Sequence, residues 1–465
     1  MPFAVRIWLF ACLLSTAIPL GFSADSTTPA LSGQLPDPST STPLPAADPF
    51  WSWFPAHTLK GQTTAIVYKH PSFPAEYSGS NSLIQHEGSK LSITATLFAG
   101  VHLWPGGEIY FNPEVAGGEG PSGVVGVAGA INGETPRVAS PDPVLSTARL
   151  FVRQTINLGG EKEKVVEDIN QIAGERAVNR LVITIGRFAA NDLFDVNAYS
   201  HDPRTQFSNW SLWENGAWDY PANTRGYTNG IATELTYSPW SLRLAIFQEP
   251  SEANGQQLDS HILNAHALTG EIEHRHVVGE LPGAVRILTF ANSSNAGRYS
   301  DSIEQGVSSG SVPDITLVRR YQMKYGFGVN VEQSLSSEFG IFGRIGWNDG
   351  HTESWAFTEI DSTASLGMSL HGSAWHRRDD VFGLAAVVNG ISSDHRNYLA
   401  AGGSGFIIGD GALNYSNEMI AETYYSFQAT SAFSLSPSMQ YVINPAYNRD
   451  RGPVWFWGVR GHADF

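Results

Sequence analysis

Short segments in which apolar and polar residues alternate recur from about residue 62 to the end of the chain. In the segment 432–442, Phe433 and Leu435 share one face, and Ser434 and Ser436 share the other. Successive side chains of a β-strand point to opposite faces, so this pattern predicts strands with one apolar and one polar face. Clusters of Gly, Pro, Asn, Asp and Ser separate the segments, as is typical of turns.

The polar face of these segments carries small or charged residues, as a water-filled lumen requires. The apolar face carries Trp and Tyr near the segment ends, where a membrane barrel meets its two lipid–water interfaces. About sixteen to eighteen segments are candidate strands. Together with their turns, at about 25 residues each, they account for the whole chain after the leader, and both the strand number and the length of each unit are typical of porins. No fixed-period repeat favours a propeller or a solenoid. The pattern predicts an all-β fold, a transmembrane antiparallel β-barrel.

The first residues have the composition of a secretory signal peptide, with Arg6 followed by an apolar run and small residues. We therefore divide the chain into a signal peptide (1–23), a flexible leader rich in Pro, Ser and Thr (24–60) and a barrel domain (61–465). The one cysteine, Cys12, lies in the signal peptide. The mature chain is thus expected to form no disulfide and no thiolate metal site.

The charge balance and the short motifs exclude several functions. A net charge of -16 argues against nucleic acid as a partner. The glycines after Gly118 match a dinucleotide-binding pattern, but a strand-like segment follows them rather than a helix. His274 and His276 lack a third metal ligand, and Ser404 lacks the elbow of a serine hydrolase. We expect no catalytic residues, no metal and no cofactor.

Residues 199–230 combine aromatic rings, carboxylates, guanidinium groups and amides without clear alternation. Sugars are held by aromatic faces and by planar polar groups that bind their hydroxyls, so this segment is a candidate pore constriction. Alternatively, it folds on itself, with its tryptophans buried or anchored at the membrane surface and with internal Arg–Asp pairs. The candidate residues are Asp202, Arg204, Trp210, Trp213, Trp218, Asp219 and Arg225.

Several charged residues in the strand candidates are predicted to face the lumen. Arginines in a water-filled pore set its field and donate pairs of hydrogen bonds to solutes. Taken singly, each of them is better explained as a solvated lumen residue than as a residue that binds a solute. They are Arg149, Arg153, Arg187, Glu234 and Arg344.

Long strings of the sequence resemble a known family. They include GRFAANDLFDVNAYSHDPRTQFSNWSLWENGAWDYPANTRGYTNG, VVNGISSDHRNYLAAGGSGFIIGDGALNY and NPAYNRDRGPV. From about residue 60 to Phe465 the chain resembles the carbohydrate-selective porins of the OprB family. The resemblance implies a sixteen-stranded outer-membrane barrel that admits glucose and other small sugars by facilitated diffusion.

The predicted partners are small sugars, outer-membrane lipid and, through the terminal Phe465, the barrel assembly machinery. The barrel is a monomer or a homotrimer. Two other functions remain open on the residues alone. One is an outer-membrane channel for other small or anionic solutes, and the other is a secreted β protein that binds or cleaves carbohydrate.

Overall fold

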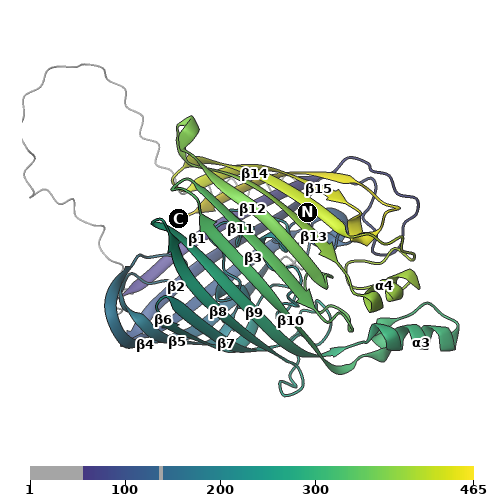
Figure 1. The fold of residues 1–465 in the computed structure, drawn as a ribbon, viewed down its shortest axis with the longest axis horizontal. Helices are drawn as coiled ribbons and strands as arrows, with labels where there is room; N and C mark the ends of the chain where they lie inside the picture. The colour runs from purple at the N-terminus through teal and green to yellow at the C-terminus, as the bar shows by residue number, and fades with distance from the viewer. Residues whose placement is uncertain (1–55, 136–139) are drawn as a thin grey trace, which may run out of the picture. The chain divides into compact units, whose positions relative to one another are not determined.

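Sixteen antiparallel strands form one closed barrel in the computed structural model, which describes residues 56–135 and 140–465 (Figure 1). Each strand pairs with its sequence neighbours, and β1 closes the barrel against β16 from Gln62↔Asp464 to Lys69↔Trp457. The all-β barrel predicted from the alternation is thus confirmed. The strands are β1 (His57–Lys69), β2 (Lys90–Trp104), β3 (Gly107–Gly118), β4 (Val144–Val165), β5 (Gly174–Phe188), β6 (Thr228–Tyr237), β7 (Trp240–Gln248), β8 (His266–Val278), β9 (Leu281–Ala296), β10 (Arg320–Ser334), β11 (Phe339–Asn348), β12 (Ser362–Gly372), β13 (Arg377–Gly390), β14 (Glu418–Thr430), β15 (Phe433–Ile443) and β16 (Val454–Asp464).

The expected signal peptide lies outside the described residues, and so does the expected leader up to residue 55. Strand β1 begins at His57, so residues 57–60, which the sequence placed in the leader, belong to the barrel wall. Among the described residues, no helix is long and apolar enough to cross a membrane.

The two faces of the wall follow the predicted alternation. On β10, Tyr325 and Phe327 are 52% and 42% exposed on the outer face, whereas Asn330 points inward and is 2% exposed. On β15, Leu435 is exposed and Ser436 is buried in the same way. Apolar residues therefore cover the outside of the barrel, as hydrocarbon requires, and polar residues face the inside.

Short turns connect the strands at one end of the barrel and long loops connect them at the other. Helices α3 (Tyr299–Ser309) and α4 (Ser393–Ala400) lie side by side at the long-loop end (Figure 1). We call the two ends the short-turn end and the long-loop end. Exposed tryptophans stand near both ends, Trp240 at the first and Trp455 at the second, as in the aromatic girdles of membrane barrels.

Candidate functional site

The connection between β5 and β6, residues 189–227, folds into the barrel and carries the short helix α2 (Trp210–Trp213). We call it the inward loop. It reaches strands on distant sides of the wall: the N–H of Asp195 donates to Glu271 of β8 at 2.8 Å, and the N–H of Ser208 donates to Glu422 of β14 at 2.8 Å. The inward loop therefore crosses the lumen and is fastened on both sides.

The three predicted tryptophans form the apolar core of the inward loop. Trp210, Trp213 and Trp218 are each at most 1% exposed. Trp210 stacks on Phe357 with ring centroids 4.3 Å apart, and Trp218 lies against Tyr220 at 5.1 Å. The prediction that these three rings line the pore is therefore wrong. They are buried, as in the alternative of a loop that packs on itself.

Two of the predicted charged residues, Arg204 and Asp219, bind the inward loop to other parts of the barrel. Arg204 bridges Glu134 and Glu114 at 2.6 and 3.0 Å. Asp219 accepts the N–H of Trp355 at 2.8 Å and lies 3.4 Å from the Nζ of Lys324.

Asp202 and Arg225 are partly exposed and are also held within the inward loop. The Oδ1 of Asp202 accepts the N–H of Arg204 at 3.0 Å, and the N–H of Arg225 donates to Asn223 at 3.1 Å. Neither residue belongs to the lining of the cavity described next.

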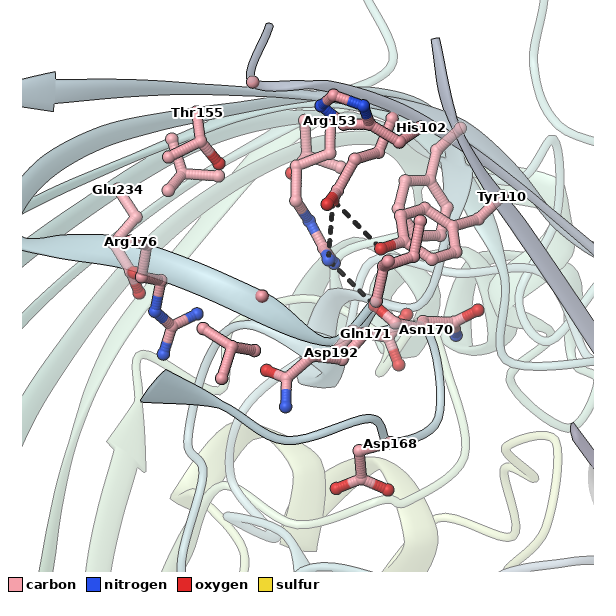
Figure 2. Close-up of a pocket in the computed structure, with 18 of the residues that line it drawn as sticks. His102, Tyr110, Arg153, Thr155, Asp168, Asn170, Gln171, Arg176, Asp192 and Glu234 are labelled. Carbon is pink, nitrogen blue, oxygen red and sulfur yellow. Dashed lines mark hydrogen bonds and ion pairs between the residues drawn. The ribbon is translucent and has the colours of Figure 1, made fainter. Parts of the chain in front are cut away.

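A cavity of about 950 Å³ lies between the inward loop and strands β3 to β6 (Figure 2). It extends from the short-turn end, at Gly106 and the turn 166–173, to Leu193 and His201 of the inward loop. We call it the lumen cavity. Three predicted residues line it: Arg149, Arg153 and Glu234.

Each arginine on the lumen cavity is paired with a carboxylate. Arg149 makes two hydrogen bonds to Asp192, at 2.7 and 2.5 Å. Arg153 lies 3.9 Å from Glu108 and stacks over the ring of Tyr110 with its guanidinium carbon 5.0 Å from the centroid. Such pairs leave planar hydrogen-bonding edges in the cavity with little net charge.

Further arginine–carboxylate pairs lie on strands β4 to β7. Arg176 and Arg180 share Glu163 at 2.6 and 3.0 Å. Glu234 accepts a 2.5 Å hydrogen bond from Arg243. The lumen cavity is thus lined by alternating charges that largely cancel.

Two predicted lumen arginines lie elsewhere. Arg187 is in register with Leu150 and Asn229, both exposed on the outer face, and its Nε donates to the carbonyl of Thr147 at 3.0 Å. The prediction that Arg187 faces the lumen is therefore wrong. Arg344 does point inward, but the inward loop covers it, and Asp195 binds it at 2.9 Å.

The sequence reasoning missed most residues that line the lumen cavity. Asp192 lies in a string that resembles the family, but nothing in its neighbourhood marks it as the partner of Arg149. Asn170 and Gln171 come from a polar turn with no recognisable motif. They are brought to the cavity by the way the turn folds, which residue type alone does not reveal.

No group of three or more His, Cys, Asp or Glu able to hold a metal ion occurs in the described residues. His274 and His276 do lie together on β8, with parallel rings whose centroids are 6.0 Å apart.

Glu249, which follows β7 at the long-loop end, should make the stability of the protein depend on pH. Its side chain is fully buried; burial raises its pKa well above the ordinary value, and nearby Asp219 adds to the shift. Because the folded protein holds this proton more tightly than the unfolded chain, stability falls as the pH rises from about 4, where the unfolded carboxyl ionises. Glu249→Gln removes that loss.

Thermal unfolding in detergent across a pH series measures the effect. The Glu249→Gln variant and the natural protein should unfold together near pH 4 and diverge at higher pH, with the variant more stable. Glu252→Gln, an exposed change in the same loop, is the control. Parallel curves for Glu249→Gln and the natural protein would show that Glu249 does not titrate in this way.

Comparison with known proteins places the barrel in a family. The model for the carbohydrate-selective porin, OprB family, matches residues 82–465. A putative porin, QuiX, from Acinetobacter baylyi is 22% identical over 279 residues, which cover 55% of this chain and 57% of that protein. The chain thus matches little more than half the length of this relative.

One solved structure in particular shows the same fold. The high-pH structure of OprB from Pseudomonas putida aligns with a TM-score of 0.67 at 14% identity, covering 88% of this chain and 94% of that one. The outer-membrane channel DcaP of Acinetobacter baumannii aligns at 10% identity with a TM-score of 0.48, covering 88% and 97%. Because the family model spans most of the sequence and nearly all of the barrel, the chain belongs to the carbohydrate-selective porin, OprB family, of Gram-negative outer membranes.

Proposed function

We propose that the protein lets small neutral carbohydrates such as glucose diffuse passively into the periplasm. In outer-membrane barrels the short turns face the periplasm and the long loops face the outside. On this orientation a solute enters among the long loops, passes the inward loop and leaves through the lumen cavity. No energy source is required, since the barrel only provides a wetted path.

The pairing of charges on the lumen cavity is the observation that carries the proposal. An unpaired arginine would attract anions, but Arg149 and Arg153 each have a carboxylate partner, Asp192 and Glu108. Neutral polyols gain most from such a lining, because its donors and acceptors bind hydroxyls without a strong field. Binding must stay weak, since a solute that enters must also leave.

Swelling of proteoliposomes in isosmotic solutes tests this function. We expect faster swelling in glucose than in an amino acid or a sugar acid of similar size, with lipid vesicles that lack protein as the control. Equal rates would make the protein a general porin. Faster swelling in the sugar acid would favour the channel for anionic solutes that the sequence left open.

The remaining alternative from the sequence, a secreted carbohydrate-binding or carbohydrate-cleaving protein, does not fit a closed barrel of this family with an apolar outer face. The sequence is compatible with a barrel that acts as a monomer or as a homotrimer. Sedimentation of the detergent-purified protein separates the two states.

A further inference from the structure

The turn between β4 and β5 differs from the other turns at the short-turn end. The others span residues 105–106, 238–239, 279–280, 335–338, 373–376 and 431–432, whereas this one spans 166–173. Its residues from Asp168 to Ala173 line the lumen cavity, and Figure 2 shows Asn170 near Arg153 and Asp168 farther from it. We call it the exit turn.

Side chains from three strands hold the exit turn in the lumen. Arg153 of β4 donates to the carbonyl of Asn170 at 2.8 Å, and Asn112 of β3 donates to its Oδ1 at 2.9 Å. Thr58 of β1 donates to Glu167 at 2.6 Å. The turn is therefore fastened to the wall beyond the two strands that it connects.

The exit turn also has a fixed shape of its own. The N–H groups of Asp168 and Gln171 donate to each other's carbonyls at 3.1 and 3.0 Å. Asn170 adopts a φ of +52°, a left-handed conformation that asparagine tolerates better than most residues. Ile172 is 8% exposed and packs in the same apolar cluster as Tyr110 and Phe151. These contacts make the turn a rigid obstacle rather than a loose loop.

We propose that the exit turn is a size filter at the periplasmic mouth of the lumen cavity, which admits small sugars and holds back longer oligosaccharides. This rests on the proposed function of the same cavity. The polar groups of Asn170, Gln171 and Asp168 narrow the mouth beside the paired Arg153 and Glu108. A sugar that leaves the cavity passes this rim of donors and acceptors, which replaces part of its hydration.

Shortening the exit turn tests the filter. Val165 and Gly174 are paired across the hairpin, so a two-residue Asn-Gly turn can join them in place of residues 166–173. Asn170→Ala is the milder variant, since it removes the side chain that Asn112 holds. Heat-modified migration in gel electrophoresis verifies that each variant folds as a barrel.

Ser336→Ala is the matched control. Ser336 lies in another turn at the same end and accepts the N–H groups of Glu338 and Phe339 at 3.2 and 3.0 Å. The change therefore weakens a turn of the same end without altering the residues that line the lumen cavity.

Single-channel conductance and swelling in sugars of increasing length are the two measurements. We expect the shortened variant to conduct about twofold more than the natural protein and to pass longer oligosaccharides, because the mouth is wider. Asn170→Ala should change in the same direction by less, and Ser336→Ala should match the natural protein. Unchanged conductance and an unchanged size limit in the shortened variant would overturn the filter.

The two proposals fail in different ways. If the natural protein conducts ions but causes no swelling in any sugar, the carbohydrate function is overturned. The conductance of the shortened variant still decides whether the exit turn obstructs the channel.

Discussion

Replacing Glu422 with glutamine is expected to release the inward loop from the wall. Glu422 points into the barrel from β14 and is 1% exposed. Its carboxylate accepts the N–H and the Oγ–H of Ser208, at 2.8 and 2.9 Å, and the N–H of Asn209 at 2.9 Å. A carboxylate suits this place because all three partners are donors.

Glutamine has the same shape but only one acceptor oxygen. Its NH₂ group must face one of the backbone N–H groups, which then stays buried without an acceptor at a cost of about 1–3 kcal/mol. A tenfold change in population corresponds to about 1.4 kcal/mol, so the displaced loop becomes about tenfold more populated. Arg204, which is 5% exposed in the inward loop, becomes accessible to the same extent.

Trypsin cleavage at Arg204 in the detergent-solubilised protein measures this release. We expect Glu422→Gln to be cut about tenfold faster than the natural protein and to show larger, noisier single-channel currents. Ser426→Ala, on the same face of β14, retains the anchor and serves as the control. Equal cleavage rates in all three proteins would mean that Glu422 does not hold the loop.

A second carboxylate on the same strand repeats this arrangement. Glu418 accepts the N–H groups of Ala128, Gly129 and Ala446, each at 2.9 Å. The two glutamates therefore fasten three different loops to one strand. Combining Glu418→Gln with Glu422→Gln extends the same test to the neighbouring loops.

The barrel wall was predictable because its pattern is local. The alternation in 432–442 identified β15 and assigned the correct faces to Leu435, which is exposed, and Ser436, which is buried. One face must be apolar in lipid, so the sequence itself records which way each side chain points.

Arg187 shows where this reasoning fails. In the segment LVITIGRF both faces carry apolar side chains, Val182 on one and Ile183 on the other, so the phase of the strand cannot be read from hydrophobicity. The register with Leu150 places Arg187 outward. Only the pairing of neighbouring strands, which depends on the whole barrel, decides the face.

The inward loop was predictable in composition but not in arrangement. Its aromatic and charged residues marked it as special, yet the same residues suit a pore lining or a packed core. The choice depends on partners such as Glu422, which bind backbone N–H groups of Ser208 and Asn209. Backbone donors are the same in every residue, so no sequence pattern records these contacts.

Changing Asp192 to asparagine is expected to convert the lumen cavity from nearly neutral to anion-selective. Asp192 binds Arg149 through both carboxylate oxygens and also accepts the N–H of Ala189 at 3.0 Å. Asparagine keeps an acceptor for the loop but removes the negative charge that balances Arg149. At about 12 Å and an effective dielectric near 20, one unit charge contributes about 1.4 kcal/mol, or about tenfold in the preference for anions.

The reversal potential across a bilayer with a salt gradient measures this preference, and swelling in a sugar acid measures its consequence for transport. Asp301→Asn is the control, since it removes the same charge from helix α3, where Asp301 pairs with Arg320 at 2.7 Å outside the lumen cavity. We expect the anion preference and the sugar-acid rate to rise in Asp192→Asn alone. If both variants shift the reversal potential equally, net charge rather than the Arg149–Asp192 pair governs selectivity, and the charge-paired lining loses its role in favouring neutral sugars.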